Sequence, residues 1–457
     1  MAQNFAMPRF WRIFGAERKT PERAAMEKLM QYVWQHRLWT PADMTTVDGL
    51  RVTVVDPGLL NTGSGPDFFN AKIEIGGKMW AGNVEIHVRA SDWHRHGHDG
   101  DHAYDSVILH VVDRDDARIM RPGGCGEIPQ LVMPCSPDFS RRYSEMVDRP
   151  LSELACAGEL PSLPGVHLTA WLDSLAIERL SRKAERILEL VRHFEGHWDS
   201  AVYVVLARAL GFGLNSDAFE RLALSVPLRT LLKHRDSPVA LEGILFGQAG
   251  FLDSPEADPG DHYVARMKEE YRFMANKFGL TPPRSLGWRM ARMRPQNFPH
   301  RRIATLAAMI ADGFRIGYGI TEVTTEQEAR QLFTINLTGY WSRRYNFGPP
   351  SARSVRALSD SSIAILIINV VAPVLYAHSI MSGSDEARER AIGLLQSLKP
   401  ESNHITTLFA GAGVGCRNAF DSQALIELRN NYCNARKCLY CRIGHRFLAA
   451  KARRTPG

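Results

Sequence analysis

The chain has 457 residues, too many for one compact core, so two or three domains are expected. A hydrophobic fraction of 45% and a charged fraction of 23% are ordinary for a globular protein and exclude a disordered or fibrous chain. The net charge of +7 comes from residues 416–457, where nine Lys or Arg face two Asp or Glu, and nine minus two equals the whole excess. A basic segment of this kind suits a phosphate-binding surface, and an ordinary C-terminal tail has the same composition.

No stretch approaches the roughly 20 apolar residues of a membrane span. The most apolar run, residues 363–376, contains Asn369 and Pro373 and predicts a buried helix. The N-terminal residues lack the apolar core of a secretion signal. Seven cysteines, four of them in the last 42 residues, do not resemble a secreted disulfide framework. We therefore expect a cytoplasmic protein with no membrane partner.

The first part of the chain predicts a mixed α/β core. Thr20 and Pro21 are typical of a helix start, and apolar residues at helical spacing continue the helix to about residue 36. Strands are predicted at residues 50–55, 69–75, 80–88 and 106–112. The pair Gly76 and Gly77 predicts a tight turn between the second and third of these strands.

Three side chains on this hairpin are the candidate catalytic residues. Glu85 and His87 are two apart on one strand, so they point the same way, and Asp67 begins the neighbouring strand. Two carboxylates and an imidazole are suitable ligands and acid–base groups for a divalent metal and a water nucleophile. The alternative is a turn aspartate after Pro66 and a solvated strand face.

Residues 91–105 are rich in histidine and aspartate. The segment contains His94, His96, His98 and His102. Alternate histidines suit a strand face that binds a second metal such as zinc, whereas Gly97 and Gly100 favour a polar loop that happens to contain histidine. Both interpretations remain open at this point. His110, within the apolar strand, is expected to be a satisfied core histidine.

From residue 168 onward the apolar spacing is helical, and no fixed-period repeat is visible. The expected fold class is an α+β N-terminal core, a mostly α-helical domain and a small Cys-rich metal-binding C-terminus. The expected boundaries are residues 20–150, 160–410 and 411–450.

One part of the helical region combines arginines with aromatic residues. Residues 284–302 contain six arginines and no acid, with Trp288 and Phe298 among them. Arginine binds phosphate in a bidentate way and aromatic faces stack on bases, so we predict nucleic-acid contact. The predicted contacts are Trp288, Arg289, Arg292, Arg294, Arg301 and Arg302. The alternative is a helix whose Trp and Met residues belong to the core.

The C-terminus predicts a thiolate metal site. Cys416, Cys433, Cys438 and Cys441 are separated by sixteen, four and two residues. Four thiolates would bind either a four-iron four-sulfur cluster or a tetrahedral zinc ion, and His445 could replace one cysteine. One distant and three close ligands favour the cluster, which would have a structural role and would fix a short basic segment. The alternative is four unrelated cysteines.

Two resemblances add to this interpretation. Pro66-Asp67 and Glu85-Ile86-His87 resemble the motif of the PD-(D/E)xK nuclease superfamily, whose core is helix, three strands, helix and strand. His87 stands where lysine is usual. The segments GPDFFNAKIEI, RMRPQNFPHRRIATLA and YCNARKCLYCRIG are similar to a bacterial family of uncharacterised proteins along residues 25–448. Some nucleases of the same superfamily also carry an iron–sulfur cluster held by one distant and three close cysteines.

The nuclease resemblance implies a restriction-endonuclease-like core that hydrolyses phosphodiester bonds in DNA, or secondarily RNA, in repair, recombination or defence. Asp67 and Glu85, with the carbonyl of Ile86, would hold magnesium or manganese, and His87 would orient or deprotonate the water. The alternative is a catalytically inactive nucleic-acid-binding or scaffold protein that lost activity when histidine replaced lysine.

Overall fold

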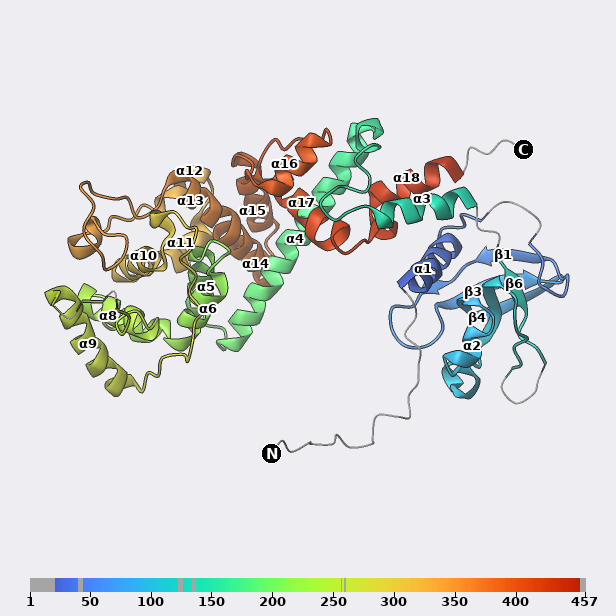
Figure 1. The fold of residues 1–457 in the computed structure, drawn as a ribbon, viewed down its shortest axis with the longest axis horizontal. Coiled ribbons are helices and arrows are strands. Elements are labelled where there is room, and N and C mark those ends of the chain that lie inside the picture. Colours follow the sequence, from blue (N-terminus) through green and yellow to red (C-terminus); the bar gives the residue numbers. More distant parts are fainter. Residues whose placement is uncertain are drawn as a thin grey trace, which may run out of the picture. The chain divides into compact units, whose positions relative to one another are not determined.

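The computed structural model describes residues 21–39, 44–121, 126–133, 137–255, 257–258 and 260–452. Cys125 and Cys135 lie outside these residues. The chain forms two compact units (Figure 1). Unit 1 comprises residues 1–162 and 431–457, and unit 2 comprises residues 163–430, so unit 2 is inserted into the chain of unit 1. The segment expected as a separate C-terminal domain, 411–450, is divided between the two units.

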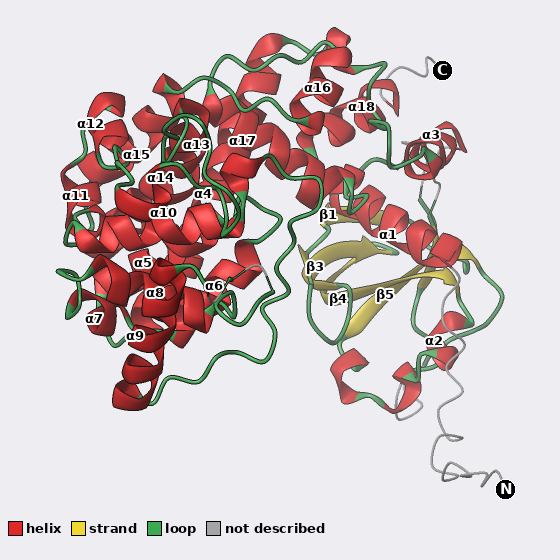
Figure 2. Ribbon diagram, turned by 60° about the vertical axis from the view of Figure 1, so that its left-hand side comes forward, coloured by secondary structure: helices red, strands yellow, loops and turns green. Residues whose placement is uncertain are grey.

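Unit 1 is built on a mixed sheet, drawn in yellow in Figure 2. Its strands are β1 (Val52–Asp56), β2 (Leu59–Leu60), β3 (Phe68–Ile75), β4 (Lys78–Arg89), β5 (Val107–Arg114) and β6 (Gln130–Val132). The spatial order is β1-β3-β4-β5-β6, with β2 also paired to β3. β3 is antiparallel to both of its neighbours, β1 and β4, whereas β5 runs parallel to β4 and β6 parallel to β5. The four predicted strands and the turn at Gly76 and Gly77, both with positive φ, are confirmed.

The two halves of β4 differ in burial. Residues 78–81 of β4 pair with β3 alone and are exposed, whereas residues 84–87 pair with β5 and are all buried. Helix α1 (Pro21–Gln35), the predicted first helix, packs against β4 and buries Leu29, Val33 and Trp34 in the same core. Polar side chains in this half of β4 are therefore removed from water.

The connection from β4 to β5 folds back onto the sheet as short helical turns. These are α2 (Asp92–Arg95), η1 (His98–Gly100) and η2 (His102–Tyr104). Trp93 is fully buried, and Asp92, itself 1% exposed, accepts the backbone N–H of Arg89 and pairs with Arg23. Gly97 adopts a φ of +77°, which lets the chain reverse between α2 and η1. The histidine-rich segment is therefore anchored at Asp92 and Trp93, while most of its other residues are exposed.

The C-terminal segment packs into unit 1 beside residues far away in sequence. Helix α3 (Pro137–Asp148) contacts helix α18 (Arg442–Ala452), and the two are neighbours in Figure 1. Leu439 and Leu448 join the hydrophobic core that contains Phe139 and Tyr143. Leu439 belongs to the short helix η9 (Cys438–Tyr440). The π-helix η8 (Leu428–Cys433) precedes η9 in the chain.

Unit 2 is helical, as predicted, and contains no strand among its described residues. Its α-helices are α4 (Gly165–His193), α5 (Trp198–Leu210), α6 (Ser216–Ser225), α7 (Leu228–Leu232), α8 (Pro238–Gln248), α9 (His262–Phe278), α10 (Pro299–Ala311), α11 (Ile316–Glu322), α12 (Glu326–Gln331), α13 (Asp360–Leu366), α14 (Ala372–Ser382), α15 (Asp385–Ser397), α16 (His404–Gly411) and α17 (Ala419–Glu427). The shorter helices are η5 (Pro295–Asn297), η6 (Gly339–Ser342) and the π-helix η7 (Ile367–Val371).

The most apolar segment of unit 2 is the continuous helix from α13 through η7 to α14. Residues 360–382 are long and apolar enough to cross a membrane by length and composition, but 67% of the apolar window is buried inside the protein. The bent pair α10 and α11 passes the same test of length and composition. The predicted buried helix at residues 363–376 is confirmed, because Leu366, Val370 and Leu375 are inaccessible to solvent.

Candidate metal centre

Asp67 and Glu85 lie side by side where the start of β3 meets the second half of β4. Asp67 immediately precedes β3, and its Oδ2 accepts the backbone N–H of Ile86 at 3.0 Å. The backbone N–H of Asp67 in turn donates to Glu85 Oε2 at 3.0 Å. Gln31, from α1, donates from Nε2 to the other oxygen of Asp67 at 2.9 Å. These bonds fix both carboxylates, and Glu85 is only 5% exposed.

The electrostatics of this pair favour a cation. Burial, and then the proximity of Glu85, raises the pKa of Asp67 to about 8, while the hydrogen bonds from Gln31 and Ile86 act in the opposite direction. Two carboxylates removed from water repel each other, and a positive charge between them relieves both the desolvation and the repulsion. The acid–acid contact is therefore suited to metal binding.

His87 joins the pair as the strand alternation predicted. Its Nε2 lies 3.3 Å from Glu85 Oε1, and its side chain is 1% exposed. Its Nδ1 lies 2.9 Å from Nε2 of His110, and its Nε2 lies 2.9 Å from Nδ1 of His96. His87 is therefore fully enclosed by polar partners and does not form part of a solvated strand face.

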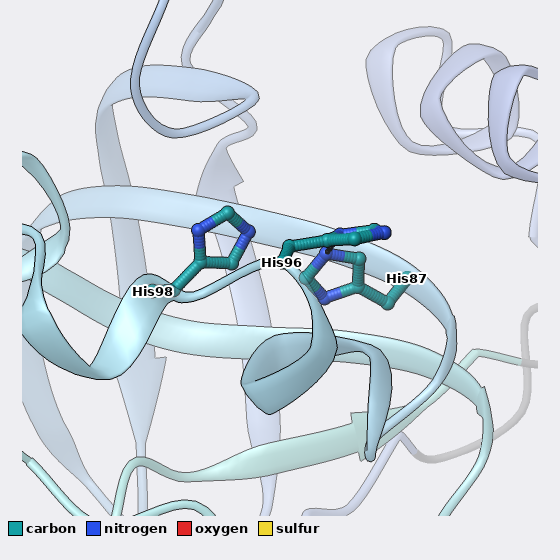
Figure 3. Close-up of side chains that lie close together, drawn as sticks. All are labelled: His87, His96 and His98. Carbon is teal, nitrogen blue, oxygen red and sulfur yellow. Dashed lines mark hydrogen bonds between the residues drawn. The ribbon is translucent and has the colours of Figure 1, made fainter. Parts of the chain in front are cut away.

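The histidine-rich segment contributes two more imidazoles. His96 and His98 follow α2 and turn toward β4, where they meet His87 (Figure 3). One ring nitrogen from each of these three histidines lies within 4.8 Å of the others, and His98 Nε2 is 3.4 Å from Glu85 Oε1. The ring of His98 is stacked on Tyr104 at 3.8 Å between centroids, which holds it in place.

The other two histidines of the segment do not face this centre. His94 is exposed and its Nδ1 lies 2.7 Å from Asp99 Oδ2. His102 is also exposed and pairs with Asp105 at 3.0 Å. The strand face suggested for this segment is wrong, because residues 92–104 form short helical turns. His96 and His98 lie beside His87, whereas His94 and His102 are exposed as in a polar loop.

His110 was expected to be a core histidine and is in fact adjacent to the centre. It is fully buried on β5 directly opposite Glu85 in the parallel register. Burial, followed by the charges of His98 and His94, lowers the pKa of His110 to about 3, so its ring is neutral. A neutral imidazole can accept a hydrogen bond from Nδ1–H of His87, which would leave His87 Nε2 available to a metal. No local sequence signal identifies this role, because it depends on the β4–β5 register.

The donor set fits a divalent metal that accepts both nitrogen and oxygen. It offers the imidazoles of His87, His96 and His98 and the Glu85 carboxylate, which lies 3.3 Å from His87 and 3.4 Å from His98, while Asp67 adjoins Glu85. Imidazole ligands suit zinc, iron, copper or nickel, whereas magnesium and manganese prefer oxygen ligands. The residues predicted from the hairpin are thus brought together, with two histidines added from the following segment.

The predicted nucleic-acid contacts in residues 284–302 separate into two groups. Arg289, Arg292 and Arg294 are exposed. Arg301 and Arg302 are 0% and 1% exposed, and their guanidinium groups donate to the backbone carbonyl oxygens of unit 2, for example from Arg301 to Trp341, Arg344 and Arg356.

Trp288 packs and hydrogen-bonds within unit 2. Its Nε1 donates to the carbonyl oxygen of Ala249 at 2.9 Å, and its ring packs against Phe219 and Phe251. Arg302 is bound in a similar way, since it donates to Ala357 O at 3.0 Å and to Asn297 Oδ1 at 2.7 Å. Trp288, Arg301 and Arg302 therefore hold loops of unit 2 together.

The predicted thiolate ligands belong to different units. Cys416 is part of unit 2, whereas Cys433, Cys438 and Cys441 are part of unit 1. Cys441 is buried, whereas Cys416, Cys433 and Cys438 are half-buried. His445, the suggested substitute ligand, is hydrogen-bonded through Nδ1 to the hydroxyl group of Tyr32.

Comparison with known proteins places the chain in a family without giving an activity. No curated protein matches it, and no solved structure matches it. A model of a protein family of unknown function, DUF2851, matches residues 27–404, which is most of the chain. The expected membership in a family of uncharacterised proteins is thereby confirmed, and the chain belongs to the DUF2851 family.

Proposed function

We propose that unit 1 is a metal-dependent phosphodiesterase that cleaves nucleic acid, with DNA as the first substrate to test. The observation that carries the proposal is the cluster of His87, His96 and His98, with Glu85 Oε1 3.3 Å from His87 and 3.4 Å from His98. Asp67 lies next to this cluster, because its backbone N–H donates to Glu85. A buried carboxyl group with a raised pKa beside clustered imidazoles is a candidate for metal-assisted hydrolysis.

The topology of unit 1 supports a restriction-endonuclease-like core. Helix α1 is followed by the antiparallel strands β1, β3 and β4, then by the helical turns of residues 92–104, then by β5 parallel to β4. This is the element order of the PD-(D/E)xK superfamily, with short turns where its second helix stands. Asp67 and Glu85 occupy the positions of the two motif acids, so the proposal of phosphodiester hydrolysis follows from the motif together with its context.

The residues of the centre can be given distinct roles. A divalent ion held by Asp67, Glu85 and the imidazoles would polarise the scissile phosphate and lower the pKa of a bound water. Of the two ions that the motif implies, manganese is a first-row transition metal and magnesium is not, so manganese is the first ion to test with imidazole ligands. His110 would keep the ring of His87 in one orientation, and Gln31 would keep Asp67 aimed at the centre.

Basic surface residues would hold the nucleic-acid backbone. In unit 2 the exposed residues Arg289, Arg292 and Arg294 are suited to phosphate contact. A pocket of about 570 Å³ in the same unit is lined by Gln296, Arg353 and Arg356 among others. In unit 1, Lys437, Arg442 and Arg446 are exposed around η9 and α18. These groups would bind nucleic acid with an affinity that falls as the salt concentration rises and does not depend on the base sequence.

The test uses purified full-length protein with manganese or magnesium and labelled single-stranded DNA, double-stranded DNA and RNA. Cleavage is expected in the wild type and lost in Asp67→Ala and His96→Ala. His94→Ala is the matched control, because His94 lies in the same segment and faces Asp99 instead of the centre. Retained cleavage in Asp67→Ala, or equal loss in the His94 and His96 variants, would contradict the assignment.

A second function is favoured by one observation. His87 stands where the superfamily uses lysine, and it is enclosed between Glu85, His96 and His110 instead of reaching toward a substrate. A catalytically inactive nucleic-acid-binding or scaffold protein would still bind manganese and DNA. Manganese titration by calorimetry, combined with the cleavage assay, separates the two functions, since binding of both without turnover supports the second.

A further inference from the structure

The two crossings between the units lie next to cysteines. Unit 2 begins at residue 163 and ends at residue 430. Cys156 precedes the first crossing by a few residues, and Cys433 follows the second by a few residues. Cys438 and Cys441 come next in the chain, so four cysteines of unit 1 belong to the two segments that enter and leave unit 2.

The fold of unit 1 brings Cys156 to the C-terminal cysteines. Cys156 and Cys438 both pack against the hydrophobic core of unit 1, whose members include Phe139, Leu439 and Leu448. Burial, and after it the proximity of Cys441 and Cys438, raises the pKa of the Cys156 thiol to about 12. The pKa of the Cys438 thiol is raised to about 11, first by burial and then by Cys441. Cys156, Cys438 and Cys441 are therefore close enough for the charge on one to affect the pKa of another.

The backbone around these cysteines is tightly turned. The π-helix η8 ends at Cys433, whose carbonyl accepts the N–H of Arg436 at 3.1 Å. The N–H of Cys441 donates to the carbonyl of Cys438 at 3.3 Å, which closes the turn between the last two thiols. A Cβ on Gly444 would lie 2.1 Å from the Cys438 carbonyl oxygen, so only glycine lets α18 pack this closely on the turn.

We propose that Cys156, Cys433, Cys438 and Cys441 form a four-thiolate site for a soft metal centre, either an iron–sulfur cluster or a zinc ion, and that Cys416 is not a ligand. Thiolate ligands suit zinc ions and iron–sulfur clusters, and the shared packing of Cys156 and Cys438 with the turn from Cys438 to Cys441 gathers such ligands. Arg149 beside Cys156 and Arg436 beside Cys438 favour the thiolates.

This site would join the segment that leads from unit 1 into unit 2 to the segment that returns from unit 2 to unit 1. The segment from residue 431 onward is short, and it contributes only a few apolar side chains, such as Leu439 and Leu448, to the core. A metal centre that binds it to Cys156 would hold the C-terminal segment in place by folding-coupled coordination. The inference concerns stability and metal content, and it does not depend on the proposed phosphodiesterase activity.

The experiment compares Cys156→Ser with Cys416→Ser in full-length protein purified without oxygen. Iron, acid-labile sulfide and zinc are measured per chain, together with visible absorbance. We expect the wild type and Cys416→Ser to carry the same metal and Cys156→Ser to lose most of it. Iron with sulfide identifies a cluster and zinc alone identifies a single-ion site. Loss in Cys416→Ser with retention in Cys156→Ser overturns the assignment, as does wild-type protein without either metal.

A second measurement on the wild type covers the case in which Cys156→Ser does not fold. Native protein is labelled with a maleimide before and after treatment with a chelator, and the labelled cysteines are identified by mass spectrometry. Chelation should increase the labelling of Cys156, Cys433, Cys438 and Cys441 together and leave Cys416 unchanged. An increase that includes Cys416 and omits Cys156 would refute the proposed ligand set.

Discussion

The buried carboxyl group of Glu242 should make the stability of unit 2 depend on pH. Glu242, on α8, is 9% exposed. One of its oxygens accepts hydrogen bonds from the hydroxyl group of Tyr263 at 2.9 Å and from Nε1 of Trp341 at 2.6 Å. Burial raises the pKa of Glu242 from its ordinary value of 4.5 to about 7, although both hydrogen bonds act to lower it. The folded state therefore holds the proton more tightly than the unfolded state does.

The sign and size of the effect follow from proton linkage. Below pH 4.5 both states are protonated and the group costs no stability. Between pH 4.5 and about 7 the unfolded state releases its proton first, so stability falls as pH rises, and above about 7 the loss is complete. Each pKa unit corresponds to roughly 1.36 kcal/mol, so the total loss is about 3 kcal/mol.

Glu242→Gln tests this reasoning, because the amide oxygen can still accept both hydrogen bonds and cannot ionise. We expect the variant to exceed the wild type in free energy of unfolding by about 1 kcal/mol at pH 5 and about 3 kcal/mol at pH 8. Denaturant unfolding followed by tryptophan fluorescence at both pH values measures the difference. Glu269→Gln, an exposed change on α9, is the control and should show no such trend. A Glu242→Gln difference that does not change with pH would refute the argument.

Three further outcomes follow from individual contacts. His110→Phe should weaken manganese binding about 10- to 100-fold in calorimetry, because His87 loses the partner that orients its ring; unchanged affinity would remove His110 from the centre. Arg301→Lys should lower the free energy of unfolding of unit 2 by roughly 3 kcal/mol, since one ammonium cannot serve the carbonyls that the guanidinium binds, and a neutral result in denaturant titration would contradict this. Gly82→Ala should destabilise unit 1 by about 2 kcal/mol in thermal unfolding, because the new Cβ would lie 2.7 Å from the Ser106 carbonyl oxygen and 2.4 Å from Ile108; an unchanged midpoint would show that β5 can move away.

The sequence by itself determined the local elements of unit 1 and part of its centre. Period-2 alternation and the Gly76–Gly77 pair predicted the hairpin, because both signals act between residues close in the chain. The same alternation placed Glu85 and His87 on one side, and the hairpin brought Asp67 beside them. Helical spacing likewise predicted unit 2 as a helical body.

Only the tertiary structure decided which histidines meet the hairpin. In the irregular segment after β4 the direction of each side chain depends on how the turns pack on the sheet, and Gly97 sends His96 and His98 inward while His94 stays exposed. His110 meets His87 through the parallel register of two strands that are separated by those turns. Neither relation has a periodic signature in the sequence.

The same limit explains the arginines and the cysteines. A run of basic residues has the same composition whether it faces solvent or is buried, and the carbonyl groups that bind Arg301 come from residues about 40 to 55 positions away. The neighbourhood of Cys156 and Cys438 joins residues on either side of an inserted unit. Contacts over such separations are set by how apolar surfaces pack together, which spacing along the chain does not encode.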